Sequence, residues 1–544
     1  MDDLKDFLKQ NKIDAIIIPS VDEFFGEYVP EGRNRLQVAT GFSGSNGIAV
    51  IGLQKSALLT DGRYLQQAPM QIPSHFEVID MGVQNLSQYL GGLGLVKIGF
   101  LQELHTAEWV QKIKASFSTA AGNLTVNGEV SLIRKNISVD EEIKLIPISC
   151  EKIDKILNIN TKYVENIDKI IKIGEPKTDI IASLKIKDAM LICDPASVCW
   201  LLNIRGKSVP YCGLFNCYLA VFKDGSYKII NNLYDLLDIF DRCDKIMTDF
   251  SQINYHLYEQ LQTKLVHQKN AITALKAIKT EQEIAGMKQA NAEDSIAITK
   301  FIKWIKTNPN TTEIDATAKL LEFRKESPHF IEQSFATIMG AGSNSSIIHY
   351  HSTPKTNKII GHNDILLVDS GGHYNYYGTS DITRTICINK PKQQIKTDYT
   401  LVLKGHIAVA TAIFKQGTTG SQIDSLARQF LLQQGKDYNH GTGHGVGYYL
   451  SVHEGPCSLS KKSNVPLEAG MILSNEPGFY VANSHGIRIE NLMVVRTHSK
   501  DMLCFETISF VELEHDFIDA NMLTNQEKEY IEYYSALCVN NLCK

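Results

Sequence analysis

Acidic residues at the ends of apolar runs are the feature that most constrains how this chain can fold. Asp369 ends the run ILLVD, and Asp381 opens the run DITRTICI. Glu476 follows MILSN, and Glu490 lies within GIRIENLMVV. A carboxylate at the end of a buried strand is costly unless it is paired or bound to a metal ion. The sequence therefore predicts strands whose acidic ends meet, with the two aspartates brought together by a hairpin.

His444 adds an imidazole to this set, in a glycine-rich segment where the backbone can approach a ligand closely. Four carboxylates and one imidazole form an oxygen-rich set, which suits two adjacent divalent ions better than one tetrahedral zinc. Each residue has a simpler explanation taken alone. Either aspartate could cap a helix or sit in a turn, and a lone histidine is usually structural. Arg488 and Glu490, two positions apart in a strand, could form a surface ion pair.

Chain length, charge and composition exclude several classes of protein. A chain of 544 residues should hold two to four domains, and its net charge of -5 gives no footprint for nucleic acid. No apolar run is long enough to cross a membrane, and the acidic amino terminus lacks the pattern of a signal peptide. The eleven cysteines form no CxxC pair, and Cys212 and Cys217 are expected to be buried free thiols. These features predict a cytoplasmic protein that binds neither nucleic acid nor membrane.

The order of apolar runs predicts an α/β (α+β) chain of three domains, at residues 1–150, 151–270 and 271–544. DAIIIPS and GIAVIG read as buried strands of the first domain, and AMLICDP and YLAVFKDG as strands of a second domain of similar build. The third domain should begin with a helix whose capping box runs from Thr280 to Glu283. A second amphipathic helix (TTEIDATAKLLEFRKE) and a terminal helix (TNQEKEYIEYYSALCVNNL) are also expected.

Two metal ions about 3.5–4 Å apart would lower the pKa of a bridging water and polarise a scissile carbonyl group. The leaving amine then needs a proton, and the developing oxyanion needs hydrogen-bond donors. His349 in IIHYH and His453 in VHEGP are the candidates for these roles. HEGPC does not match HExxH, and no GxSxG or Cys/His pattern supplies a competing nucleophile.

The ordered motifs TGFSGSNG, TDGRY, WLLNIRG, IIHYH, DSGG…SDITRT, HGTGHGVG…VHEGP, EAGMILSNEPGFY and GIRIEN resemble those of the creatinase/aminopeptidase P group of metallopeptidases. The resemblance runs along nearly the whole chain. It implies two creatinase-N-like α/β domains followed by a pita-bread catalytic domain, in a homodimer. The activity it implies is hydrolysis of the Xaa-Pro bond at the amino terminus of a peptide.

The resemblance also implies roles for individual residues. Two divalent ions would be bound, most often Mn²⁺, with Co²⁺ or Zn²⁺ as alternatives. Their ligands would be Asp369, Asp381, His444, Glu476 and Glu490. Asp381 and Glu490 would bridge the two ions. Glu476 would also handle the proton of the attacking water. His349 and His453 would carry protons and stabilise the transition state. The residues that would shape the substrate site around the proline are His440, Tyr480 and Arg488.

One departure concerns the spacing of the two aspartates. Relatives place them eleven positions apart, whereas Asp381 lies twelve positions after Asp369. A residue added inside a strand would turn one side chain to the other face, whereas one added in a turn would not. The segment from Tyr374 to Gly378 is expected to contain the addition.

Three other activities remain to be compared with this prediction. One is a prolidase-type dipeptidase, since the sequence does not determine whether dipeptides are accepted. Another is a non-catalytic pita-bread protein that serves as a binding module. A third is a metal-free, creatinase-like hydrolase. The presence of all five candidate ligands argues against the last two.

Overall fold

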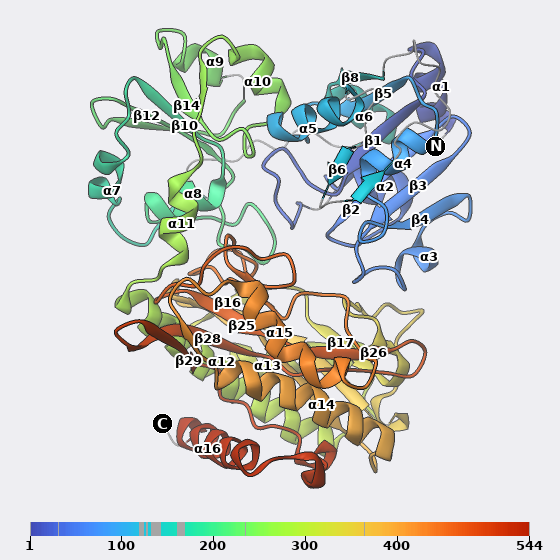
Figure 1. The fold of residues 1–544 in the computed structure, drawn as a ribbon, viewed down its shortest axis with the longest axis vertical. Coiled ribbons are helices and arrows are strands. Elements are labelled where there is room, and N and C mark those ends of the chain that lie inside the picture. Colours follow the sequence, from blue (N-terminus) through green and yellow to red (C-terminus); the bar gives the residue numbers. More distant parts are fainter. Residues whose placement is uncertain are drawn as a thin grey trace. The chain divides into compact units, whose positions relative to one another are not determined.

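The computed structural model describes residues 2–30, 32–118, 124–126, 129–131, 143–159, 169–233, 235–363 and 365–542. The chain forms two compact units (Figure 1). The first comprises Met1–Pro210 and Leu214–Ala271, and the second comprises Tyr211–Gly213 and Ile272–Lys544. A further division of the first unit near residue 150 stays a prediction. Among the described residues, every helix is too short or too polar to cross a lipid bilayer.

The first unit contains two mixed sheets with the same pattern of strand directions. Their strand orders are β4-β3-β2-β1-β5-β8 and β13-β12-β10-β14-β15. In each sheet one strand, β1 or β10, pairs antiparallel with a hairpin strand on one side and parallel with the next strand on the other. This common pattern confirms the repeated build that the order of apolar runs predicts.

The strands of the first sheet are β1 (Ala15–Pro19), β2 (Gly47–Gly52), β3 (Ser56–Thr60), β4 (Phe76–Asp80), β5 (Lys97–Leu101) and β8 (Lys144–Ile148). Those of the second sheet are β10 (Ala189–Ile192), β12 (Tyr218–Phe222), β13 (Tyr227–Ile230), β14 (Ile246–Thr248) and β15 (Leu265–His267). Short pairs are formed by β6 (Leu124–Val126), β7 (Glu129–Ser131), β9 (Ile171–Lys172) and β11 (Ile204–Arg205).

The helices up to the end of the first unit are short. They are α1 (Asp2–Gln10), α2 (Arg35–Thr40), α3 (Ala68–Gln71), α4 (Leu86–Gly92), α5 (Ala107–Ser118), α6 (Cys150–Leu157), α7 (Thr178–Ser183), α8 (Pro195–Leu201), α9 (Asp235–Ile239), α10 (Tyr255–Leu261) and α11 (Ala271–Ala277). Cys212 and Cys217 are buried and free, as the sequence predicts.

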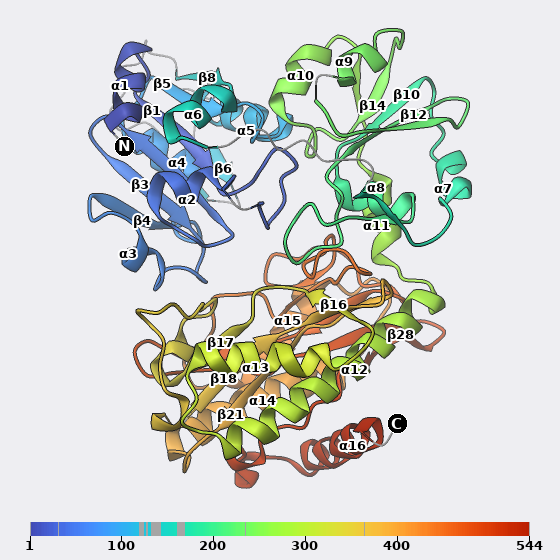
Figure 2. The same ribbon diagram turned by 180° about the vertical axis from the view of Figure 1, so that it is seen from behind.

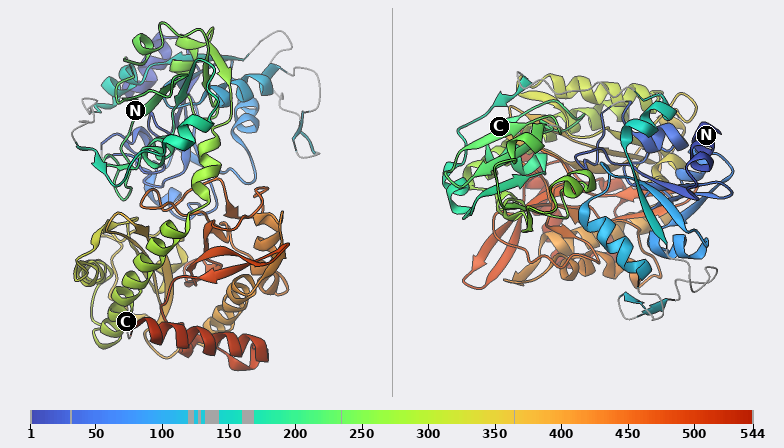
Figure 3. Two further views of the ribbon diagram at one scale, coloured as in Figure 1. Left: turned by 90° about the vertical axis from the view of Figure 1, so that its left-hand side faces the viewer. Right: turned by 90° about the horizontal axis from the view of Figure 1, so that it is seen from above.

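The second unit contains two main sheets, each covered by a pair of helices. The sheet β17-β18-β21 packs against α12 (Glu281–Thr307) and α13 (Glu313–Lys325), which lie in front of it in Figure 2. The sheet β22-β29-β28-β25 packs against α14 (Gln393–Ala410) and α15 (Gly420–Leu432). The terminal helix α16 (Asn525–Leu542) contacts α12 and α14 (Figure 3).

The strands of these sheets are β17 (Ile338–Ala341), β18 (Ile365–Ser370), β21 (Ile382–Cys387), β22 (Ile413–Lys415), β25 (Ile472–Asn475), β28 (Asn491–Ser499) and β29 (Met502–Thr507). Smaller sheets contain β16 (Phe330–Gln333), β19 (Gly372–Tyr374), β20 (Gly378–Thr379), β23 (Gly443–His444), β24 (Ser458–Leu459), β26 (Gly478–Val481) and β27 (His485–Arg488). Short 3₁₀ turns are η2 (Gly342–Ser346), η3 (Ile360–His362), η4 (His515–Phe517) and η5 (Ala520–Met522).

The start of α12 is the predicted capping box. The Thr280 hydroxyl accepts a hydrogen bond from the Glu283 backbone N–H at 3.2 Å, and the Glu283 carboxylate accepts from the Thr280 N–H at 2.9 Å. Helical spacing then buries one apolar face, formed by Ile284, Met287, Ile298, Phe301 and Ile305. The long helix α12 is therefore held at its start by local contacts and along its length by the core.

The strands that carry the two aspartates pair without interruption. The register of β18 with β21 runs from Ile365 opposite Cys387 to Ser370 opposite Ile382. Their connection contains the small hairpin β19–β20, in whose turn Asn375 and Tyr376 adopt left-handed backbone angles. The regular register agrees with the prediction that no residue is added inside either strand.

Candidate metal centre

The five predicted ligands lie at the ends of strands or in the connections between strands. Asp369 lies near the end of β18, and Asp381 immediately precedes β21. His444 ends the short strand β23, Glu476 follows β25, and Glu490 lies between β27 and β28. The ligands are spread over more than one hundred positions, from Asp369 to Glu490, so the second unit must be folded before they can meet.

One part of the expected geometry is wrong. Arg488 and Glu490 do not lie on one continuous strand, because pairing of β27 with β26 ends at Arg488 and pairing of β28 with β25 begins at Asn491. Their side chains nevertheless reach the same threonine. Thr383 Oγ1 donates to Glu490 Oε2 at 2.7 Å and accepts from Arg488 Nε at 3.2 Å.

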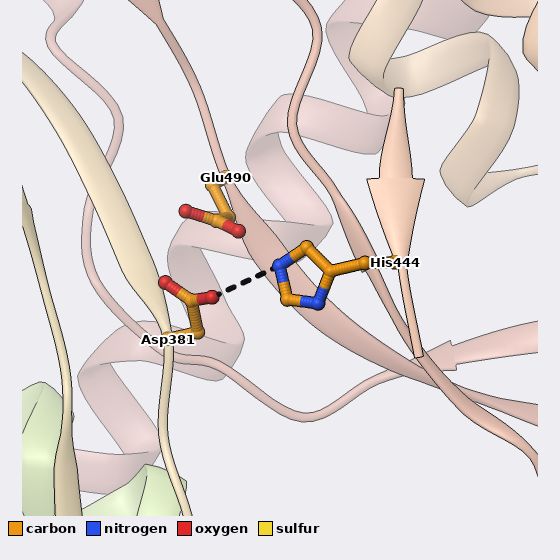
Figure 4. Close-up of side chains that lie close together, drawn as sticks. All are labelled: Asp381, His444 and Glu490. Carbon is orange, nitrogen blue, oxygen red and sulfur yellow. Dashed lines mark ion pairs between the residues drawn. The ribbon is translucent and has the colours of Figure 1, made fainter. Parts of the chain in front are cut away.

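Three of the predicted ligands converge tightly. Ligand atoms of Asp381, His444 and Glu490 all lie within 4.8 Å of one another, and Figure 4 shows the three side chains directed at a common point. His444 Nε2 is 3.2 Å from Asp381 Oδ2 and 3.6 Å from Glu476 Oε1. Glu476 therefore adjoins this cluster as well.

The His444 ring is oriented by its other nitrogen. Nδ1 lies 2.9 Å from the Gly445 carbonyl oxygen, which can only accept, so Nδ1 carries the hydrogen of this bond. Nε2 is then the atom presented to the carboxylates. The His444 backbone N–H also donates to Ser474 Oγ at 2.9 Å, and that hydroxyl donates to Glu476 Oε1 at 3.3 Å. Such contacts fix the ring and carboxylate in the orientation that a metal ligand needs.

Only one of the two carboxylate oxygens of Asp369 has a hydrogen-bond partner among the described residues. Its Oδ2 accepts a hydrogen bond from Arg488 Nη2 at 2.7 Å. Its Oδ1 is buried and meets no hydrogen-bond partner among the residues that the structure describes. Leaving a buried charged oxygen unsatisfied is unfavourable by more than about 1–3 kcal/mol. A cation at this position would remove that penalty.

Burial and mutual repulsion act on the other carboxylates. Burial raises the pKa of Asp381 well above its usual value, and the charge of Asp369 raises it further. Burial and the neighbouring Asp381 raise the pKa of Glu490 in the same way. Burial also raises the pKa of Glu476, although His444 and Arg488 partly offset the increase. A buried group of carboxylates that repel one another fits divalent cations, which would restore the charged form of each.

Thr383 and Thr385 are site residues that sequence reasoning missed. Thr385 Oγ1 accepts from the Arg488 backbone N–H at 3.0 Å, beside the Thr383 contacts described above. Both lie in β21, two and four positions after Asp381, so their side chains point to the same side of the strand as that of Asp381. This period of two in DITRT was the signal that could have identified them.

The three predicted substrate residues are in contact. Arg488 Nη1 donates to the Tyr480 hydroxyl oxygen at 2.6 Å. His440 Nδ1 donates to the Gly441 carbonyl, so His440 Nε2 accepts from the Tyr480 hydroxyl at 3.0 Å. His440 Nδ1 also lies 4.0 Å from Glu476 Oε2. This chain of contacts joins the candidate substrate residues to the ligand set.

The two candidate proton carriers lie on loops beside the site. The ring of His453 is 4.3 Å from that of His444, edge to face. The half-buried His349 follows η2, and the preceding Ile348 carbonyl accepts from Arg488 Nη2 at 3.4 Å. The loop of His453 continues with Glu454, a further residue that the sequence did not single out.

Glu454 is the centre of a buried charge cluster. Its carboxylate oxygens lie 2.9 Å from Lys276 Nζ and 2.9 Å from Lys279 Nζ, and all three side chains are at most 5% exposed. The Glu454 backbone N–H also donates to the Gly445 carbonyl at 2.8 Å. These contacts tie the loop that carries His453 to the segment next to His444.

Comparison with known proteins assigns families to three parts of the chain. Residues 1–134 and 168–283 each match a creatinase/prolidase N-terminal domain. Residues 285–497, which include all five candidate ligands, match metallopeptidase family M24. The expected order of two creatinase-type domains and a catalytic domain is thereby confirmed.

Relatives match over nearly the full length. "Probable Xaa-Pro aminopeptidase P" of Botryotinia fuckeliana is 31% identical over 592 residues, covering 98% of this chain and 88% of the relative. The protein of the same name from Arthroderma otae is 32% identical over 558 residues, covering 98% and 87%.

Solved structures show the same architecture. The X-prolyl aminopeptidase of Caenorhabditis elegans, described as a cytosolic enzyme with a di-nuclear active site, superimposes with a TM-score of 0.86 at 25% identity, covering 98% of this chain and 92% of that one. Prolidase from Pyrococcus furiosus has a similar fold over 61% of this chain and 98% of its own, with a TM-score of 0.50 at 23% identity. Given the identity to full-length relatives, this chain belongs to the Xaa-Pro aminopeptidase P family of the M24 metallopeptidases.

Proposed function

We propose that this protein is a metallo-aminopeptidase that removes the first residue from peptides with proline at the second position. The observation that carries the proposal is the convergence of Asp381, His444 and Glu490, with Glu476 adjoining. Full-length similarity to proteins named Xaa-Pro aminopeptidase P supports the specificity.

Two divalent ions bound by Asp369, Asp381, His444, Glu476 and Glu490 would polarise the scissile carbonyl and increase the acidity of a water molecule. Glu476 takes the proton of that attacking water at a carboxylate oxygen. The water oxygen joins the carbonyl carbon, and the bond from that carbon to the proline nitrogen breaks. The departing proline nitrogen then receives a proton.

His453 and His349 are proposed to donate in this reaction. His453, beside the His444 ring, is placed to hydrogen-bond the carbonyl oxygen as negative charge develops there. His349 is proposed to deliver the proton to the proline nitrogen. The proton that Glu476 takes from the water replaces the one that His349 gives to the proline nitrogen. The second water proton leaves the new carboxyl group for solvent, so the products are a neutral amine and a carboxylate with one proton released.

Recognition of the proline is assigned to His440, Tyr480 and Arg488. The Tyr480 hydroxyl is held between Arg488 and His440. A ring locked in this way offers a rigid aromatic surface for the pyrrolidine ring, and Arg488 keeps one N–H, on Nη1, that could donate to a substrate carbonyl. The three residues therefore define the position of the second substrate residue.

The finer assignments are also proposals. The metal is Mn²⁺, because carboxylate oxygens dominate the donor set, with Co²⁺ and Zn²⁺ as alternatives. The protein is proposed to be a cytoplasmic homodimer. The ten cysteines within the described ranges are all free, which fits a reducing compartment.

The test uses Arg-Pro-Pro and Arg-Ala-Pro peptides with protein that has been stripped of metal and reloaded with Mn²⁺, Co²⁺ or Zn²⁺. Metal-dependent release of arginine from the first peptide alone is the expected result. Cleavage of Xaa-Pro dipeptides without cleavage of longer peptides would indicate a prolidase instead. Absence of turnover with two ions bound would overturn the proposed activity.

A further inference from the structure

Each aspartate ligand has a serine as its neighbour, and both serines reach the same buried ion pair. Ser370 directly follows Asp369, and Ser380 directly precedes Asp381. Ser380 Oγ donates to Asp294 Oδ2 at 2.7 Å. Arg324 Nη2 donates to Ser370 Oγ at 3.0 Å. The two ends of the connection between the ligands are thus attached to one pair of charges.

The ion pair itself is rigid and fully enclosed. Arg324 Nε donates to Asp294 Oδ1 at 2.7 Å, and Arg324 Nη2 donates to Asp294 Oδ2 at 3.1 Å. Both side chains are 0% exposed. A two-point contact between a planar guanidinium and a carboxylate fixes distance and orientation together. Asp294 lies on α12 and Arg324 on α13, the two helices that cover the sheet β17-β18-β21.

Stability alone does not account for this arrangement. An enclosed ion pair is often no more stabilising than apolar side chains of similar volume. Asp294 Oδ1 also accepts from the Tyr374 hydroxyl at 2.7 Å, so each of its oxygens holds a residue of the connecting segment as well as Arg324. The contacts act on the segment between the ligands, not on the apolar core around it.

The ion pair joins the two sides of the hairpin that separates the two ligands in sequence. Residues 371–379 form that connection and include the turn with left-handed Asn375 and Tyr376. At its base the two chains are close: the Ser380 N–H donates to the Gly372 carbonyl at 2.9 Å, and a Cβ on Gly371 would lie 1.9 Å from the Ser380 carbonyl oxygen. The length of the hairpin can therefore vary beyond this base without moving the aspartates.

We infer that Asp294, Arg324, Ser370 and Ser380 are positioning residues that set the separation of the ligands Asp369 and Asp381, and so the affinity for the two metal ions. This inference rests on the proposed metallopeptidase function. It explains how a spacing of twelve residues is compatible with the site: helices α12 and α13, through one ion pair, decide the separation of the ligands.

The test replaces one serine at a time, as Ser370→Ala and Ser380→Ala. Asp294 is left in place, because its removal would leave Arg324 charged and buried without a partner. Tyr374→Phe is the matched control, since it removes a hydrogen bond to the same carboxylate at an equally buried position that adjoins neither ligand. Metal-free protein is titrated with Mn²⁺ by calorimetry, and its thermal unfolding is measured without metal.

Each serine variant should bind at least one ion about 10–100-fold more weakly, as is usual when a group supporting a ligand is lost. Its kcat should recover as Mn²⁺ is raised, while the unfolding temperature of the metal-free variant should match that of Tyr374→Phe. The control should keep the metal affinity of the parent. Should an alanine variant fail to fold, Ser→Cys at the same position removes the hydroxyl with little change in volume and carries the same expectation.

The outcomes separate this inference from the proposed function. Failure of the parent protein to bind two ions would overturn the proposed function itself. Two ions bound by the parent, with equal affinity in the serine variants, would overturn the positioning role alone. An equal loss of affinity in Tyr374→Phe would do the same, because it would indicate a general loosening of the core.

Discussion

At the scale of single residues, Arg488 connects the candidate metal ligands with the candidate substrate residues. It donates to the ligand Asp369, to the orienting hydroxyl of Thr383 and to the substrate residue Tyr480. Burial disfavours the charged guanidinium, but the neighbouring Tyr480, Asp369 and Glu476 outweigh this effect and raise the pKa of Arg488 above its usual value. One guanidinium thus holds both a metal ligand and the proposed proline site in place.

Glu490→Gln should remove metal and abolish turnover. The amide keeps the shape but loses the charge that offsets a divalent ion, and Thr383 can still donate to its oxygen. Metal content is measured by mass spectrometry alongside peptide cleavage. Glu468→Gln, at an exposed position of the same unit, is the control. Full metal content with near-normal activity in Glu490→Gln would contradict the dinuclear model.

His453→Ala should lower kcat by roughly 10²–10⁴-fold while metal remains bound, because a donor to the reacting groups is lost. KM should change much less than kcat. The measurement is steady-state cleavage together with metal content, and the exposed His498→Ala serves as the control. A parallel fall in metal content would show that His453 supports the ligand His444 and does not act on the substrate.

At the scale of elements, the loop of His453 is anchored by charge. The buried cluster of Glu454 with Lys276 and Lys279 joins this loop to the segment that leads into α12. Two ammonium groups share one carboxylate, so the cluster keeps one net positive charge. Loss of the shared carboxylate therefore exposes both lysines to an unfavourable environment, whereas loss of one lysine leaves a balanced pair.

Glu454→Gln is accordingly expected to destabilise the second unit by about 3–5 kcal/mol, the usual result of leaving buried charge unpaired. Lys276→Met should cost less, because Lys279 still balances Glu454. Urea unfolding of both variants measures the difference. Equal destabilisation by the two substitutions would show that packing, not charge balance, dominates at this site.

Two buried histidines make stability depend on pH. Burial lowers the pKa of His406 on α14 to about 3 and that of His105 to about 4, from a usual 6.5. Both rings stay neutral in the folded protein, whereas the unfolded chain takes up protons below pH 6.5. The free energy of unfolding should therefore fall as pH decreases from 6.5 towards 4, by about 1.4 kcal/mol per pH unit for each ring.

The measurement is urea unfolding at pH 7 and pH 5, with His406→Phe as the variant. Its free energy of unfolding should depend less on pH than that of the parent, since one titrating ring has been removed. His498→Phe, an exposed position, should keep the parent slope. An unchanged slope in His406→Phe would mean that its ring is protonated in the folded state.

At the scale of the whole molecule, the two units differ in what metal binding can do for them. Every candidate ligand lies in the second unit, and those ligands come from strands of both of its main sheets or from their connections. An ion that binds only the folded arrangement stabilises it by mass action. The first unit contains none of these ligands.

Metal removal is thus expected to affect the units unequally. Amide hydrogen exchange should become faster in β18, β21, β25 and β28 after chelation, while exchange in β1 and β5 should change little. Mass-resolved exchange of the chelated and Mn²⁺-loaded protein checks this, with Mg²⁺-loaded protein as a control for ionic strength. A uniform change in both units would argue against a local site.

Much of this organisation was predictable because its signals are local. The capping box at Thr280, the helical spacing from Ile284 to Ile305 and the strand around Asp369 depend on neighbours in sequence, and the structure agrees with each. The family and its activity were predictable from ordered motifs. The break between Arg488 and Glu490 was not, because alternation of residue types does not reveal where a strand changes its partner.

By itself the sequence determined the kinds of element, the family and the set of candidate ligands, since these depend on residue type and spacing along the chain. Only the tertiary structure decided which polar groups face one another. Thr383 became a partner of Glu490, and Asp294 a partner of Ser380, across 107 and 86 positions respectively. Such pairings follow from how helices and sheets pack, and burial then makes each hydrogen bond count, because water cannot replace a missing partner.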